Sequence, residues 1–235
     1  MNAWKRRMRG ALPAGLALAA AAAPAADLVL VENGVSRTPI VVFQDAPPFT
    51  RRAAGELAAY IEKTAGARPA VLEGRPDPLP AHAIWVGFQP VLTNLFPDVD
   101  FAFRHPEEIL IAASADHLAI AGRDRWDPDR LAVPGRNAPI EAKQQEYGTV
   151  NAVYTFLQDR LDVRWLWPGD LGEDIRPRPT LAFPPFRHRY HPSIRQRSTL
   201  FRLSAPGDSR GHSHDWTRRQ RLQLDSLDVD CSHAF

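Results

Sequence analysis

Residues 148–169 constrain the fold more than any other stretch, and they read GTVNAVYTFLQDRLDVRWLWPG. Apolar residues recur there at helical spacing: Val150, Val153, Tyr154, Leu157 and Leu161. The spacing predicts a helix with one apolar face, opened by Gly148 and capped by Thr149. After a tight turn at Asp162, a short strand over residues 163–167 ends at Pro168-Gly169. A helix tied so closely to a strand must bury its apolar face on a sheet.

The remaining sequence alternates short apolar runs with one further helix signal. We expect strands over residues 28–32, 39–43, 70–72, 83–87, 108–113 and 117–121, the first two joined by Asn33-Gly34. A second helix is expected from a Thr50 cap to a Gly66 C-terminus. The long polar stretch 123–147 is expected at the rim of the sheet. The predicted fold class is α/β (α+β): a mixed β-sheet with two main helices on one face, plus an incomplete C-terminal segment.

The same stretch resembles a known domain. The motif comprises Gly148-Thr149, Tyr154-x-Phe156-Leu157 and Val163-Arg164-Trp165-x-x-Pro168-Gly169. It is similar to the end of the non-catalytic N-terminal domain of family 20 β-hexosaminidases and family 67 α-glucuronidases. It also resembles secreted bacterial proteins in which the motif precedes a barrel. The resemblance spans roughly residues 28–185 and implies a non-catalytic α/β domain followed by a barrel-like catalytic domain.

This chain departs from the family pattern at two positions. Tyr147 stands where the family has Arg, which weakens the case for a sugar-contacting arginine there. Asp162 stands where the family has Gly at the end of the helix. Aspartate tolerates the left-handed backbone conformation better than most residues, so we still expect a positive φ at that position.

The N-terminal residues read as a secretory signal. Lys5, Arg6, Arg7 and Arg9 precede an apolar run over residues 11–23, and Ala23-Pro24-Ala25 fits a cleavage site. We expect a signal peptide over residues 1–25 and export to the periplasm or outside of a bacterial cell. The run is too short and too alanine-rich for a membrane span. Without these four cations the net charge falls from +2 to +2 − 4 = −2, which gives no electrostatic indication of a nucleic-acid partner.

Proline becomes frequent after Gly169, which favours an extended connection. We expect residues 26–186 to form the glycoside-hydrolase-associated domain and residues 187–235 to begin a truncated, barrel-like second domain. The second segment is too short to bury a core of its own. We therefore expect it to be loosely held, with its packing partners in a missing C-terminal domain. That domain and carbohydrate are the predicted partners.

Aromatic and arginine side chains are typical of sugar clefts. The candidates for carbohydrate binding are Trp126, Trp216, Arg218 and His233. Glycoside hydrolysis needs two carboxyl groups roughly 5–5.5 Å apart for retention or roughly 6.5–9.5 Å apart for inversion. The sequence presents no such pair, because Glu107 and Glu108 would face opposite sides of a strand. No catalytic residue is therefore predicted within the chain.

A histidine cluster offers a weaker alternative. His212 and His214 would share one face of a strand and, with Asp215, could reach one metal ion. No other cofactor is predicted. Three hypotheses follow: an accessory domain whose catalytic part is largely absent from this chain, a stand-alone carbohydrate-binding module, or a metal-dependent hydrolase built on the histidines.

Overall fold

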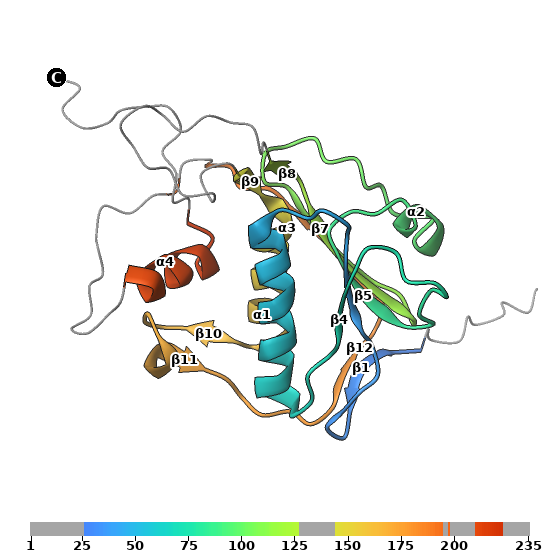
Figure 1. Ribbon diagram of the computed structural model, residues 1–235, viewed down its shortest axis with the longest axis horizontal. Helices are drawn as coiled ribbons and strands as arrows, with labels where there is room; N and C mark the ends of the chain where they lie inside the picture. The colour runs from blue at the N-terminus through green and yellow to red at the C-terminus, as the bar shows by residue number, and fades with distance from the viewer. Residues whose placement is uncertain (1–25, 127–143, 195–196, 198–209, 223–235) are drawn as a thin grey trace, which may run out of the picture.

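The structure is a computed structural model that describes residues 26–126, 144–194, 197 and 210–222 (Figure 1). Its centre is a six-stranded sheet in the order β13-β6-β7-β5-β3-β4. The strands are β3 (Ile40–Val42), β4 (Val71–Glu73), β5 (Ala83–Val86), β6 (Ile109–Ala113), β7 (His117–Gly122) and β13 (Phe186–Tyr190). Four of them, β4, β3, β5 and β7, are parallel, whereas β6 runs antiparallel to both β7 and β13. The predicted α/β class with a mixed sheet is confirmed.

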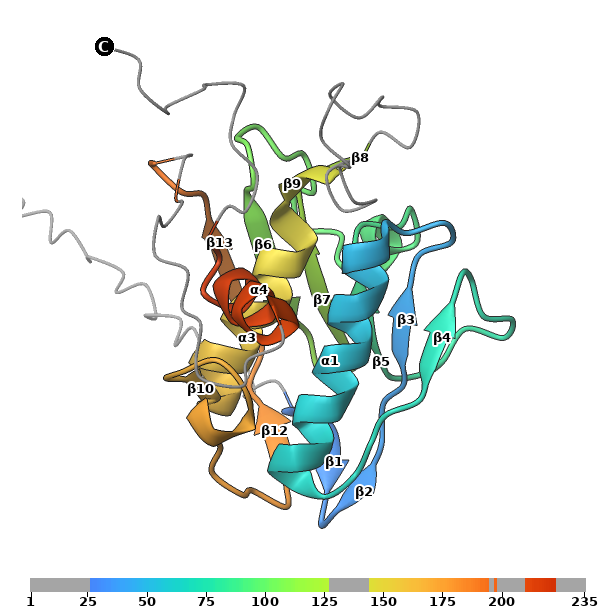
Figure 2. The same cartoon turned by 60° about the vertical axis from the view of Figure 1, so that its left-hand side comes forward.

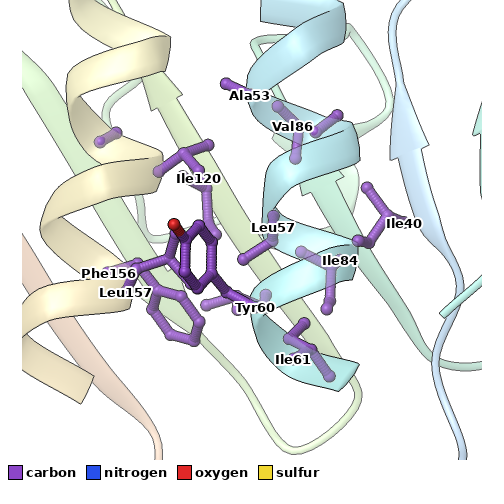
Figure 3. Packing of buried hydrophobic residues seen from close by; sticks show 14 of the residues in the cluster. Ile40, Ala53, Leu57, Tyr60, Ile61, Ile84, Val86, Ile120, Phe156 and Leu157 are labelled. Carbon is purple, nitrogen blue, oxygen red and sulfur yellow. The ribbon is translucent and has the colours of Figure 1, made fainter. Parts of the chain in front are cut away.

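Two long helices cover one face of this sheet (Figures 1 and 2). They are α1 (Pro48–Ala65) and α3 (Gly148–Leu161). Figure 3 shows Leu57 of α1 and Leu157 of α3 pointing into a shared apolar layer above Ile84 of the sheet. All three side chains are fully buried. The expectation that both helices pack on the same sheet face is therefore confirmed.

The opposite face is covered by an irregular segment that includes the short helix α2 (Leu92–Leu95). Trp85, Ala112 and Ala119 face this side, where Phe96 packs on them. Successive side chains of a strand point to opposite faces, so Trp85 points away from α1 and α3, while the neighbouring Ile84 and Val86 point toward them. Burial on both faces explains why the central strands read as continuous apolar runs.

Both predicted helix N-caps are wrong, whereas both predicted C-termini are confirmed. The first helix begins at Pro48, so Thr50 lies inside it with a buried hydroxyl that has no hydrogen-bond partner. The third helix follows Tyr147, and the amide of Thr149 donates to Oδ1 of Asp124 at 2.9 Å instead of being the capping residue. Gly66 and Asp162 end their helices with φ of 78° and 58°, in the left-handed region.

Smaller strands surround the central sheet. They are β1 (Leu28–Glu32), β2 (Val35–Ser36), β8 (Asp124–Trp126), β9 (Gln144–Tyr147), β10 (Arg164–Trp165), β11 (Glu173–Asp174) and β12 (Leu181–Phe183). The turn at Asn33-Gly34 joins β1 to β2, and not to the strand expected over 39–43, because β3 enters the central sheet. The stretch expected as a polar loop contributes the ribbon β8–β9.

The C-terminal part makes specific contacts with the rest of the molecule, contrary to expectation. Strand β13 adds to the edge of the central sheet by pairing with β6, so the sheet extends to Tyr190, past the predicted boundary at residue 186. Helix α4 (Arg210–Arg219) lies beside α1 and the β10–β11 ribbon in both views (Figures 1 and 2). Within the described residues, none of the helices is both long and apolar enough to cross a membrane.

Candidate functional site

Helix α4 docks on the β10–β11 ribbon through polar contacts to one carbonyl group. The indole Nε1 of Trp216 donates to the backbone oxygen of Trp165 at 2.9 Å, and Nε2 of Gln220 donates to the same oxygen at 2.7 Å. Two donors on one acceptor fix both the position and the rotation of α4. We call the contact region between α4, α1 and this ribbon the α4 junction.

Arg219 pairs with two carboxylates at the α4 junction. Its Nε lies 3.3 Å from Oε2 of Glu56, and its Nη1 lies 3.4 Å from Oε1 of Glu173. The guanidinium carbon also lies 5.4 Å from the ring centre of Tyr60. These two carboxylates come from α1 and β11, so the arginine joins three elements that are far apart in the sequence.

Tyr60 completes the polar contacts around Glu173. Its hydroxyl donates to Oε1 of Glu173 and accepts a hydrogen bond from the indole of Trp165 at 2.8 Å. Burial raises the pKa of the Tyr60 phenol well above its ordinary value, and the hydrogen bond to Glu173 raises it further. The phenol therefore stays neutral and acts as a donor to the carboxylate at physiological pH.

Arg218, the preceding residue, has different surroundings. The residue is only 4% exposed, and its guanidinium carbon lies 3.6 Å from the ring centre of Tyr147 and 5.1 Å from that of Phe49. Its Nε is buried without a hydrogen-bond partner, and we find no ion pair between this guanidinium and any described residue. Tyr147 immediately precedes α3 and Phe49 lies in the first turn of α1, so Arg218 sits where both long helices begin.

The Gly-Thr motif has a packing reason at the same end of the molecule. A Cβ atom placed on Gly148 would lie 2.4 Å from the backbone nitrogen of Arg123, and one on Gly122 would lie 2.2 Å from the carbonyl carbon of Gly148. Oγ1 of Thr149 accepts a hydrogen bond from the Gly122 amide at 3.2 Å. Only glycine allows two backbones to approach this closely, so the start of α3 is locked against the end of β7.

Buried carboxylates gather next to this contact, and arginines neutralise three of them. Glu146 pairs with Arg123 at 3.0 Å. Glu107 pairs with Arg197 at 2.5 Å, and Glu108 pairs with Arg189. The expectation that Glu107 and Glu108 face opposite sides of a strand is wrong, because β6 begins only at Ile109 and Glu107 has a φ of 53°.

The pKa values of Glu108 and of the partly exposed Asp124 shift in opposite directions. Burial opposes the ionisation of Glu108, but amide hydrogen bonds from His105 and Arg104 together with the Arg189 guanidinium outweigh it and hold its pKa below the usual range. Burial raises the pKa of Asp124 to about 7, despite its hydrogen bonds from Thr149. The negative charges of Glu146 and Glu107 add to that rise.

The structure brings together only some of the residues predicted from the sequence. Trp216 and Arg218 both lie in α4 but contact different elements, Trp216 the β10–β11 ribbon and Arg218 the starts of α1 and α3. Trp126 ends β8, partly exposed and opposite Gln144. His233 lies outside the described residues. The partners of Arg218 and Arg219 were missed, and the only signal for any of them was the departure from the family pattern at Tyr147.

The geometry assumed for the histidine cluster is wrong. Residues 212 and 214 lie in α4 and not on a strand, so the shared strand face assumed for them does not exist. Asp215 pairs with Arg52 at 2.5 Å. Within the part of the chain that the structure describes, no three His, Cys, Asp or Glu side chains come together as metal ligands could.

Neither a family model nor a curated protein matches this chain. Among solved structures, it is similar to a family GH115 4-O-methyl-α-glucuronidase with specificity for decorated arabinogalactans. The TM-score is 0.55 at 15% sequence identity, over 83% of this chain and 25% of that enzyme. At this identity the similarity shows the fold alone. The chain therefore has a fold found in a glycoside hydrolase and spans about a quarter of that enzyme's length.

Proposed function

We propose that this chain is the N-terminal accessory domain of an exported glycoside-hydrolase-like protein that acts in carbohydrate breakdown. The observation that carries the proposal is the fold shared, over 83% of this chain, with a quarter of a GH115 enzyme. In this proposal, a further domain of the same protein supplies the catalytic carboxyl groups, and the α/β domain positions it. The resemblance of the Gly148–Leu161 helix and its following strand to non-catalytic N-terminal domains supports the same assignment.

The state of the buried acids supports an accessory role. A glycosidase acid and its partner carboxylate must reach the scissile bond from an open cleft. Here Glu107, Glu108 and Glu146 are each bound to an arginine. Asp124 caps a helix through the Thr149 amide. These carboxylates stabilise the fold, which leaves the chemistry to residues outside the described part of the chain.

One observation favours a second candidate, a stand-alone carbohydrate-binding module. The indole of Trp167 is 49% exposed at the tip of the β10–β11 ribbon, where a sugar ring could stack on it. This candidate predicts that the chain alone is retained by a neutral polysaccharide, whose rings can stack on this indole. The accessory-domain proposal predicts retention only for a longer polypeptide that includes the next domain.

The test compares residues 26–235 with the product of any reading frame that continues beyond residue 235. Both are assayed on aryl glycosides, uronides and N-acetylhexosaminides, and both are run through gels containing a neutral polysaccharide. We expect the short chain to fold, to turn over none of the substrates and to migrate unretarded, while the longer polypeptide is active. Turnover by the short chain would refute the accessory role, and sensitivity of that turnover to a chelator would support the histidine-based alternative.

Export is tested separately. Residues 1–25 are fused to a reporter that is active only outside the bacterial cytoplasm, with a control in which Lys5, Arg6, Arg7 and Arg9 are replaced by glutamate. We expect reporter activity from the native leader and its loss in the control. Equal activity from the two leaders would contradict export through this segment.

A further inference from the structure

Two adjacent arginines of α4 differ in how their charge is compensated. Arg219 contacts the carboxylates of Glu56 and Glu173. Arg218 is the more deeply buried of the two, yet within the described part of the chain its guanidinium meets the rings of Tyr147 and Phe49 and no carboxylate. A buried cation without an anionic partner is costly, and aromatic rings cannot accept the strong N–H hydrogen bonds that a guanidinium donates.

We propose that Arg218 and the N-terminus of α1 form a binding site for an oxyanion, and that its ligand is the carboxylate of an acidic sugar. The planar guanidinium matches carboxylate and phosphate oxygens with two parallel N–H donors. The rings of Tyr147 and Phe49 meet edge to face and both contact the guanidinium, which holds it in place, so little side-chain freedom is lost when an anion binds.

The start of α1 contributes a second, independent feature. This 18-residue helix begins at Pro48, has no acidic residue in its first turn and, among the described residues, receives no side-chain cap. Its first amide groups therefore present the positive end of the helix dipole. Thr50, in the same turn, is fully buried and its Oγ1 has no partner. An unpaired guanidinium, an uncapped helix start and an unpaired hydroxyl thus belong to one corner of the molecule.

The start of α3 provides a contrast inside the same structure. There the Thr149 amide already donates to Oδ1 of Asp124, so the chain supplies its own acceptor. At α1 the chain supplies a cation instead, because the guanidinium carbon of Arg218 lies 5.1 Å from the ring centre of Phe49 in its first turn. This difference assigns the external anion to α1. That the anion is carried by a sugar rests on the proposed function, whereas the oxyanion site rests on the geometry alone.

The experiment titrates residues 26–235 at low salt with glucuronate, glucose and inorganic phosphate, each followed by calorimetry and by the NMR resonance of the Arg218 Nε–H group. We expect glucuronate to bind and to shift this resonance, and glucose to do neither. In Arg218→Met the affinity should fall about tenfold or more, since hydrogen bonds to a charged group are lost. The control Arg37→Met removes an exposed arginine that pairs with Glu32, and it should bind like the wild type.

The outcomes test two points separately: whether an oxyanion binds at this site, and whether that oxyanion belongs to a sugar. Binding of glucuronate well above phosphate supports the acidic sugar, and equal binding of both supports the oxyanion site but overturns its assignment to sugar. No Nε–H shift with either anion overturns the site. If Arg218→Met fails to fold, two measurements still test the site. They are the shift of the Arg218 Nε–H resonance in the wild type and the affinity of Thr50→Val for glucuronate, which should fall because the unpaired hydroxyl is lost. If the longer polypeptide is inactive but still binds the anion, the accessory function is contradicted and the oxyanion site is supported.

Discussion

The two regions that hold the molecule together are built in opposite ways. Beneath α1 and α3 lies an apolar layer, with Leu57, Leu157 and Ile84 fully excluded from water. Beneath α4 lies a polar junction, in which Arg219 meets Glu56 and Glu173. The apolar layer is non-directional and needs only side chains of suitable size, whereas the junction needs particular atoms at particular places.

This difference has an energetic consequence. Burial of apolar surface contributes about 25 cal/mol per Å², with no opposing desolvation of charge. Charged groups at the junction lose hydration when α4 docks, which offsets much of their attraction. We therefore expect damage to the apolar layer to unfold the whole domain, and damage at the junction to release α4 while the sheet and the two long helices stay folded.

The largest effect should come from truncating the apolar layer. Leu157→Ala removes a fully buried side chain between α3 and the sheet and should cost roughly 2–5 kcal/mol of unfolding free energy. Chemical denaturation followed by circular dichroism measures the loss. The matched control is Leu171→Ala, because Leu171 is 102% exposed and its truncation should change stability by less than about 0.5 kcal/mol. An unchanged midpoint for Leu157→Ala would contradict the packing.

The second-largest effect should come from weakening the α4 junction, which should leave the apolar layer intact. Arg219→Gln removes a charge that two carboxylates share, and we expect the docking of α4 to weaken by roughly 1–3 kcal/mol. Hydrogen exchange should show faster exchange of the α4 amides and of the Trp216 indole, with the amides of β5 and β7 unchanged. The exposed Arg37→Gln is the control. If the sheet amides lose as much protection as those of α4, the two regions form one cooperative unit.

The contrast between the apolar layer and the α4 junction also explains which features of the fold could be predicted from the sequence. Periodicity and glycine placement are local signals, so both helices, the β6–β7 hairpin and the C-termini at Gly66 and Asp162 were predicted correctly. The N-cap predictions failed because Pro48 starts α1 three residues earlier than a Thr50 cap implies, and because Asp124 reaches the start of α3 from strand β8. The junction was missed because Glu56 and Arg219 lie 163 residues apart, and nothing local marks such a pair.

A smaller, pH-dependent effect is expected at the start of α3. The folded pKa of Asp124 is raised to about 7 from an ordinary value of 3.8, so the folded protein holds this proton more tightly than the unfolded chain. The stability that protonated Asp124 contributes is therefore fully present below about pH 4 and is lost as the pH rises through 7. Asp124→Asn keeps an acceptor for the Thr149 amide and cannot ionise.

Relative to the wild type, Asp124→Asn should be stabilising by roughly 1–2 kcal/mol at pH 8 and by clearly less at pH 5, because at pH 5 the contribution of protonated Asp124 is only partly lost. This range is below the full linkage value because Asp124 retains partial contact with water. Thermal unfolding at both pH values measures the difference. Asp100→Asn is the control, since the pKa of Asp100 is lowered by hydrogen bonds from the Ala102 amide and Arg104, and it stays ionised across this range. Equal stabilisation at both pH values would contradict the titration of Asp124.

The smallest effect tests the turn that joins the two regions. Asp162 ends α3 with φ 58° and ψ 31°, a conformation that costs most residues about 1 kcal/mol and glycine almost nothing. Its carboxylate accepts hydrogen bonds from Arg164 at 3.0 and 3.1 Å, but this pair is exposed and contributes little. Asp162→Gly should therefore be neutral or stabilising by up to about 1 kcal/mol in chemical denaturation. Asp162→Ala, which loses the same hydrogen bonds and keeps the strain, should be less stable than Asp162→Gly. If the two variants unfold at the same midpoint, the left-handed conformation is not what this position selects for.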